Sequence, residues 1–259
     1  MLSEIILKTE DSEKIYANWH KQGHDNCLLI SHGFLQYKDS PIFSEIASRF
    51  SSSMDVLSID LRGHGKSSGV FTYSSKEKSD ITAALDFIDR KYKNIFIMGF
   101  SLGASASLQA AAGRKDIAGM ILISLPSSFR KIFPKFWTFE AFRTLITSIG
   151  SGKKVRGFNL FYKKKDNTAV IRGVSAPVLI IYASHDWLVG NSHVADIKEK
   201  APANVEFFEF NGPEHAEHIF EKNKDEFIYK IQNWIKTMAN PFGETGSPAG
   251  EKKGVKGYE

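Results

Sequence analysis

The sequence predicts an α/β fold with a mostly parallel central sheet and helices on both of its faces. Short runs that are apolar through nearly their whole length alternate with longer stretches that have the periodicity of amphipathic helices. A strand that is apolar on both sides is typical of a parallel sheet that is covered on both faces. A chain of 259 residues that is 42% hydrophobic can bury one large core. We therefore expect one main domain, over residues 1–240.

The predicted elements follow in order along the chain. Each predicted strand is short and apolar, and the strands cover residues 27–33, 54–63, 94–101, 119–126, 177–186 and 205–210. Each predicted helix repeats apolar residues at helical spacing, and the helices cover residues 41–52, 77–92, 104–114 and 224–239. Residues 126–176 interrupt this alternation and are rich in Phe, Lys and Arg. Residues 241–259 are dominated by Gly, Pro, Lys and Glu, which predicts a disordered tail.

Composition excludes several classes of protein. The net charge is only +5 and both signs are spread along the chain, so we expect no nucleic-acid partner. The single cysteine, Cys27, lies in an apolar run and is expected to be a buried structural thiol, because one cysteine forms neither an intrachain disulfide nor a Cys-based metal site. The first residues are acidic where a signal peptide is basic, and no apolar run is as long as a membrane span. The sequence thus predicts a cytoplasmic protein without a membrane span.

The stretch "IFIMGFSLGASAS" places Ser101 between a predicted strand and a predicted helix. Gly99 and Gly103 flank the serine at two residues' distance, which suits a very tight strand-to-helix turn because glycine relieves crowding there. Such a serine is either a nucleophile or an ordinary turn residue. The choice depends on what the rest of the chain supplies.

A nucleophilic serine needs a base, a carboxylate that orients the base, and donors for the oxyanion. For a serine on this kind of turn, the carboxylate and then the histidine follow later in the chain. Asp186 and His215 fit that order, and each follows a predicted strand. Because the carboxyl ends of parallel strands meet at one edge of a sheet, we expect Ser101, Asp186 and His215 to converge there.

Five motifs in this order resemble those of an α/β-hydrolase of the serine-esterase kind, over residues 1–240: "SHGF" (31–34), "DLRGHGKS" (60–67), "GFSLGA" (99–104), "YASHDWLV" (182–189) and "GPEHAEHIF" (212–220). The nearest likeness is to small carboxylesterases, including those that cleave cinnamoyl or feruloyl esters, and to serine aminopeptidases. The resemblance implies that Ser101 is the nucleophile, His215 the general base and Asp186 the carboxylate that orients it. It also implies an oxyanion hole formed by the backbone N–H groups of Phe34 and Leu102. Nothing in the sequence requires a metal or an organic cofactor.

Two of these assignments have a rival in the sequence. His218 lies three residues after His215 and could reach the serine if the loop were threaded differently, although we expect His218 to begin the final helix. Asp196 is the alternative to Asp186, but it falls in a helix-like stretch and is expected to face solvent. His185, next to Asp186, points away if the pleat of the strand persists.

Two further histidines belong to the motifs that carry the resemblance. The resemblance implies structural roles for both: His32 shapes the oxyanion loop, and His64 braces the turn after the strand at 54–63.

The resemblance also implies that residues 126–176 form a cap over the carboxyl edge of the sheet, where a cap would define the substrate. Its aromatic residues form either an apolar roof or ordinary packing on the core. Its excess of Lys and Arg either attracts an anionic ester or forms a solvated face.

The function predicted from the sequence is hydrolysis of a small-molecule carboxylic ester through an acyl-enzyme. A thioesterase or peptidase that uses the same residues is the alternative enzyme, and a non-catalytic binding protein on the same fold is the alternative outside enzymes. The sequence carries no prediction of the oligomeric state.

Overall fold

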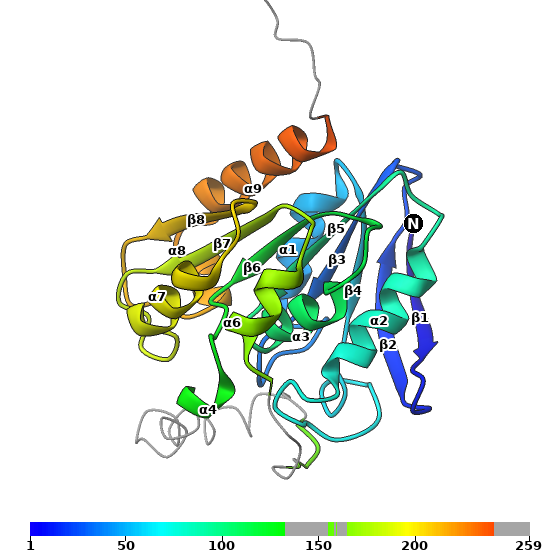
Figure 1. The fold of residues 1–259 in the computed structure, drawn as a ribbon. Helices are drawn as coiled ribbons and strands as arrows, with labels where there is room; N and C mark the ends of the chain where they lie inside the picture. Colours follow the sequence, from blue (N-terminus) through cyan, green and yellow to red (C-terminus); the bar gives the residue numbers. More distant parts are fainter. Residues whose placement is uncertain (133–154, 158, 160–164, 241–259) are drawn as a thin grey trace, which may run out of the picture.

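The computed structural model describes residues 1–132, 155–157, 159 and 165–240, and in this part of the chain it contains one eight-stranded sheet (Figure 1). The strand order is β1-β2-β4-β3-β5-β6-β7-β8, and all pairs from β4 to β8 are parallel. The predicted fold class is therefore confirmed. The strands are β1 (Leu2–Lys8), β2 (Lys14–His20), β3 (Asn26–Ser31), β4 (Asp55–Ile59), β5 (Asn94–Phe100), β6 (Ile117–Ile123), β7 (Val178–Ala183) and β8 (Val205–Phe210).

The first two strands were not predicted from the sequence. β1 and β2 pair antiparallel with each other, and β2 pairs antiparallel with β4, which puts β1 at the edge of the sheet. Exposed and partly buried positions alternate along β1, and Leu2 and Ile6 are exposed. This strand therefore lacks the continuous apolar run that marks the buried strands.

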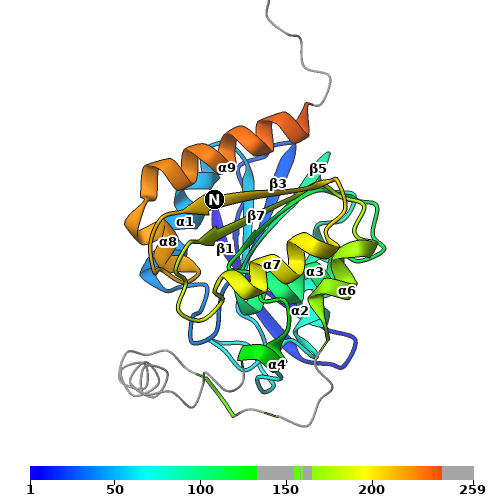
Figure 2. The same ribbon diagram turned by 60° about the vertical axis from the view of Figure 1, so that its left-hand side comes forward.

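Helices cover both faces of the sheet (Figures 1 and 2). The helices on one face are α1 (Pro41–Ser51), α8 (Glu217–Lys222) and α9 (Lys224–Ala239), and those on the other are α2 (Glu77–Ile88), α3 (Leu102–Ala111), α6 (Asn167–Val170) and α7 (Asn191–Lys200). Adjacent residues of a central strand serve opposite cores: Leu28 packs in the core under α1 and α9, and Leu29 in the core under α2 and α3. Among the described residues, no helix combines the length and apolar character needed to cross a bilayer.

Residues 126–176, the predicted cap, lie between β6 and β7, and of this segment the structure describes residues 126–132, 155–157, 159 and 165–176. The described elements are α4 (Phe129–Ile132), α6 and the 3₁₀ helix η2 (Ile171–Gly173). The two ends lie side by side, because Asn167 N donates to Ser127 O at 2.9 Å and Ser128 pairs with Asp166. Residues 133–154, 158 and 160–164 fall outside the described residues, as does the predicted tail, 241–259.

Candidate active site

Ser101 lies on the turn that joins β5 to α3. Its backbone has φ 48° and ψ −101°, a conformation that L-residues rarely adopt and that costs free energy unless neighbouring structure maintains it. The Ser101 N–H donates to Ile123 O at 2.8 Å, which ties the turn to the end of β6. The serine is therefore held in a strained position at the carboxyl edge of the sheet, with 6% of its surface exposed.

The two glycines beside Ser101 permit close packing of α3 against the strands. A Cβ on Gly99 would lie 2.7 Å from the backbone of Ala104, and a Cβ on Gly103 would collide with the carbonyl oxygen of Ser31. In each case the obstacle is backbone, which cannot move aside. The crowding predicted from the sequence is thus present at both positions.

The structure brings Ser101, His215 and Asp186 together across 114 and 29 residues of separation in the chain. Ser101 Oγ lies 3.0 Å from His215 Nε2. His215 Nδ1 lies 2.8 Å from Asp186 Oδ2 and 3.0 Å from Oδ1. Because an ionised carboxylate only accepts hydrogen bonds, Nδ1 carries the proton, and Nε2 of the neutral ring accepts from the serine.

Asp186 has four hydrogen-bonding groups around its carboxylate. Oδ1 accepts from the backbone N–H groups of Leu188 and Val189, both at 2.9 Å, and Oδ2 accepts from Ser124 Oγ at 2.8 Å. Burial alone would raise the pKa of Asp186, but the charge and hydrogen bond of His215, with the Val189 and Ser124 donors, hold that pKa below its ordinary value. The side chain is fully buried and remains an anion beside His215, whose own side chain is 12% exposed.

The oxyanion donors implied by the resemblance lie on two segments that flank Ser101. Leu102 is the first residue of α3, so its N–H is one of the four that have no acceptor within the helix. The loop after β3 passes close to the serine, because a Cβ on Gly33 would lie 3.8 Å from Ser101 Cβ. Phe34 follows in that loop, and its ring stacks on Phe71 with 4.6 Å between centroids.

The rival residues lie elsewhere. His218 is exposed on α8, a short helix before the final one, and its Nδ1 lies 2.9 Å from Glu221 Oε2. His185 is also exposed, and its Nδ1 lies 2.8 Å from Ser184 Oγ. Among the interactions of the described residues, neither histidine bonds to Ser101.

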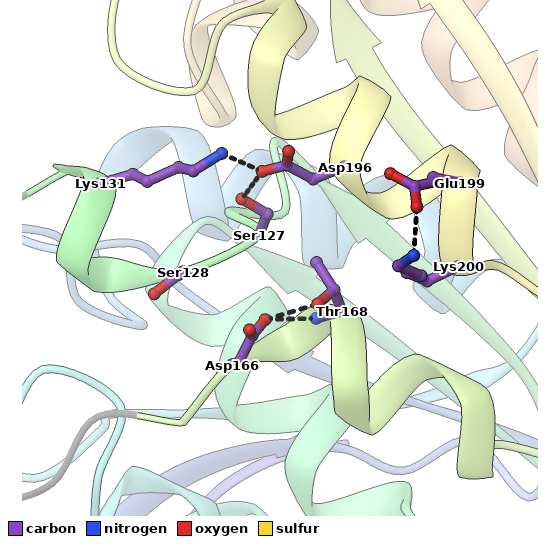
Figure 3. A pocket seen from close by; sticks show the side chains of 8 residues that line it. All are labelled: Ser127, Ser128, Lys131, Asp166, Thr168, Asp196, Glu199 and Lys200. Atoms are coloured by element: carbon purple, nitrogen blue, oxygen red, sulfur yellow. Dashed lines mark hydrogen bonds and ion pairs between the residues drawn. The ribbon is translucent and has the colours of Figure 1, made fainter.

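Asp196 lines a different pocket, of about 230 Å³, shown in Figure 3. This pocket between α4, α6 and α7 is lined by Ser127, Ser128, Lys131, Asp166, Thr168, Asp196, Glu199 and Lys200. Asp196 accepts from Ser127 Oγ at 2.7 Å and from Lys131. Its carboxylate is therefore paired, and the residue is half-buried, whereas the sequence predicted that it faces solvent. Lys131 pairs with Asp196 and Lys200 with Glu199, whereas Asp166 accepts from Thr168 N and Oγ1. No triad candidate lines the pocket.

His32, in the loop after β3, and His64, in the turn after β4, are both fully buried, with 5.1 Å between ring centroids. His32 Nε2 accepts from Leu61 N at 3.0 Å, and His32 Nδ1 lies 2.7 Å from Gly33 O. Burial lowers the pKa of His32 to about 3 and that of His64 to about 4, so both rings are neutral at pH 7. The His32 ring thus links the loop that carries Phe34 to the chain that follows β4.

Ser124, which directly follows β6, was missed by the sequence analysis. Its hydroxyl donates to Asp186 and accepts from Ala216 N at 2.9 Å. A serine after an apolar strand matches no motif, and the sequence offers no other signal for it. Among the described residues, no group of three or more His, Cys, Asp and Glu side chains is arranged to hold a metal ion.

The sheet order, the strained serine after β5 and the histidine and aspartate that follow β8 and β7 define an α/β-hydrolase. Residues 22–153, just over half of the chain, match the family described as serine aminopeptidase, S33. The chain belongs to this family.

Two curated relatives are also α/β-hydrolases. The chain is 28% identical over 194 residues to alpha/beta hydrolase domain-containing protein 17B of Homo sapiens, covering 73% of this chain and 59% of that protein. It is 27% identical over 168 residues to alpha/beta hydrolase domain-containing protein aho-3 of Caenorhabditis elegans, covering 61% of this chain and 42% of that protein. The chain thus spans about half the length of the curated relatives it matches.

Solved structures share the fold over nearly the whole chain. The esterase Pf2001 of Pyrococcus furiosus superposes with a TM-score of 0.76 at 21% identity, covering 92% of this chain and 93% of that one. The esterase RhEst1 of Rhodococcus sp. ECU1013 gives a TM-score of 0.70 at 17% identity, covering 91% of this chain and 99% of that one. At these identities the likeness establishes the fold.

Proposed function

We propose that this protein hydrolyses small carboxylic esters through a Ser101–His215–Asp186 triad and an acyl-enzyme intermediate. The observation that carries the proposal is the pair of contacts at His215, 3.0 Å from Ser101 Oγ and 2.8 Å from Asp186 Oδ2. Acyl transfer by serine requires a nucleophile that is hydrogen-bonded to a base, and a carboxylate that is hydrogen-bonded to the base and orients it. A binding protein has no physical need for all three.

In the first step, His215 Nε2 takes the Ser101 proton as Oγ attacks the ester carbonyl. The Asp186 carboxylate keeps the proton of the neutral ring on Nδ1 and stabilises the imidazolium that forms. His215 then protonates the leaving alcohol, and Ser101 retains the acyl group. In the second step His215 activates water, which hydrolyses the acyl-enzyme and regenerates the serine.

The negative charge on the carbonyl oxygen needs donors that are already in place. The N–H of Leu102, at the start of α3, and the N–H of Phe34, in the loop beside Ser101, are the donors we propose. Loss of one such donor costs about 3 kcal/mol of barrier in comparable enzymes. The Phe34 side chain stacks on Phe71, while the proposed donor is its backbone N–H, so substitution of the side chain should leave that donor in place.

The fold of two esterases supports the choice of an ester as substrate, and the family of serine aminopeptidases makes amide hydrolysis the competing outcome. A panel of p-nitrophenyl esters of rising chain length, hydroxycinnamoyl esters, an acyl thioester and an aminoacyl p-nitroanilide separates these reactions. We expect the oxygen esters to give the highest kcat/KM. A preference for the anilide would make the enzyme a peptidase with the same triad.

The direct test of the proposal is labelling with a fluorophosphonate. The wild-type protein should be labelled at Ser101, and Ser101→Ala should not react. Ester hydrolysis by Ser101→Ala should fall below about one ten-thousandth of wild type, while the protein stays folded because removal of one hydroxyl leaves almost no cavity. Full activity of the folded Ser101→Ala variant would refute the proposed mechanism.

A further inference from the structure

We propose that Ser124 is a positioning residue of the triad, whose hydroxyl holds the Asp186 carboxylate and the loop that carries His215 in one arrangement. This inference rests on the proposed function. Ser124 is fully buried at the end of β6 and does not line a surface that a substrate could reach. Its effect is therefore exerted through its two hydrogen-bonding partners.

The hydroxyl of Ser124 is shared between two segments of the site. Oγ donates to Asp186 Oδ2 at 2.8 Å, in the segment after β7. The same Oγ accepts at 2.9 Å from the backbone N–H of Ala216, the residue directly after His215. The Ser124 N–H donates to Ile181 O at 2.8 Å, which fixes the serine itself to β7.

The chemistry of the partners fixes the direction of both bonds. The backbone N–H of Ala216 can only donate and the Asp186 carboxylate can only accept, so the single hydroxyl proton lies on the bond to Asp186. With Leu188 N and Val189 N on Oδ1, the Ser124 hydroxyl completes a set of donors that prevents rotation of the carboxylate. His215 Nδ1 meets the carboxylate in the orientation that this set imposes.

Backbone conformation provides independent support. Ser124 has φ 48°, in the left-handed region that glycine enters at little cost and other residues do not. Ala216 has φ 53°, so the histidine loop is itself held in a strained conformation where the Ser124 bond attaches. The two hydrogen bonds of the Ser124 hydroxyl explain why a residue other than glycine occupies this strained position.

The backbone conformation also supplies a test that separates positioning from stability. Ser124→Ala and Ser124→Gly both remove the hydroxyl, but glycine suits the left-handed backbone, so Ser124→Gly should unfold at a higher temperature than Ser124→Ala. We expect the two variants to lose activity equally. The control is Ser107→Ala, a fully buried serine whose hydroxyl lies 3.1 Å from Ser31 Oγ.

The kinetic readout is kcat per active site, with sites counted by fluorophosphonate. For both Ser124 variants we expect kcat to fall by about 10- to 100-fold, as for groups that orient metal-ligating histidines from behind. KM should stay within about twofold of wild type, because the substrate does not touch this residue. The control should keep wild-type kcat. Activity that rises with stability from the Ala to the Gly variant would reduce Ser124 to a structural role and overturn the inference.

A second readout needs no turnover. An NMR titration of the His215 imidazole should show its midpoint moving to lower pH in both Ser124 variants, because a carboxylate that can rotate away from Nδ1 stabilises the protonated ring less. An unchanged midpoint would overturn the inference. Failure of the wild-type protein to react with fluorophosphonate would refute the proposed function, and the titration would still decide whether Ser124 controls the Asp186–His215 pair.

Discussion

Two fully buried aspartates, Asp80 and Asp186, each bind a basic side chain, but their surroundings differ. Asp80, on α2, accepts from Arg62 N at 2.8 Å and from Arg62 Nε at 2.9 Å, and Arg62 continues to Asp11 at 2.8 Å. Asp186 binds His215, whose other ring nitrogen lies against Ser101. All three guanidinium nitrogens of Arg62 bind carboxylates. The two ring nitrogens of His215 instead contact one carboxylate and one hydroxyl.

The difference shows why one aspartate fixes a loop while the other can support chemistry. Arg62 stays charged at every accessible pH, so its ion pairs hold it against Asp80 of α2 and against Asp11 and exchange no proton. An imidazole is the side chain whose ordinary pKa allows it to lose and regain a proton near neutral pH, so the pairing of His215 with Asp186 can assist proton transfer. Burial raises the pKa of Asp80 despite Arg62, while the groups around Asp186 hold its pKa below the ordinary value.

The largest effect on activity is expected from the basic group itself. His215→Ala removes the proposed base and should lower kcat by about 10⁶-fold, as in serine proteases that lose the triad histidine. His218→Ala, three residues on, should keep nearly full activity because His218 is exposed and bonds to Glu221. Steady-state kinetics on one p-nitrophenyl ester decides between them. The reverse ranking would transfer the role of base to His218.

The two aspartates can be compared by the same substitution. Asp186→Asn should lower kcat by about 10⁴-fold, because an amide beside His215 favours the wrong tautomer. Asp80→Asn leaves Arg62 buried with only Asp11 and should cost about 3–5 kcal/mol of folding free energy, since one partner of a buried pair is removed.

In the folded fraction of Asp80→Asn, kcat per active site should stay within a few fold of wild type. Urea unfolding and fluorophosphonate titration measure the two quantities separately. If Asp80→Asn lowered kcat as much as Asp186→Asn does, the contrast between a structural and a catalytic aspartate would be wrong.

The sequence was most informative where one local property determines structure. Buried parallel strands such as β5 appear as apolar runs, and the glycines around Ser101 follow from local crowding. β1 escaped prediction because a partly exposed edge strand has no such run. His218 was expected to begin the final helix, but it lies in the separate short helix α8, and the final helix α9 begins at Lys224. Local periodicity does not define the boundary between these two helices.

The supporting residues of the site could not be predicted because their partners are distant in the chain. Ser124 bonds across 62 residues to Asp186 and across 92 residues to Ala216. Asp196 was expected to face solvent, and only the fold reveals that Ser127 and Lys131 lie beside it. The triad candidates were identified because Asp186 and His215 follow Ser101 in the expected order, each after a predicted strand. What holds them in place depends on side-chain packing.

The smallest expected effect is on the folding free energy as the pH falls, because buried groups whose pKa values shift in opposite directions oppose one another. Burial lowers the pKa of His32 to about 3 and of His64 to about 4, so the unfolded chain takes up protons below about pH 6.5 that the folded protein does not, and stability falls with acid. Burial raises the pKa of Asp60 to about 6 and also raises that of Asp80. Here the folded protein takes up the extra protons, so these carboxyls contribute more stability as the pH falls through this window.

Because these contributions oppose each other, we expect acid to stop the reaction before it unfolds the protein. Only neutral His215 can accept the Ser101 proton, and an unperturbed histidine titrates near pH 6.5, so kcat/KM should fall along an acid limb between about pH 5.5 and 7.5. Asp186, with its lowered pKa, keeps its charge here, and the stability it contributes is lost only below about pH 4. Parallel profiles of kcat/KM and far-UV circular dichroism from pH 4 to 8 measure both events, and activity should return when the sample is brought back to pH 8. A flat activity profile would exclude histidine as the base, and loss of the dichroism signal along the same limb would mean that acid acts through the fold instead of through His215.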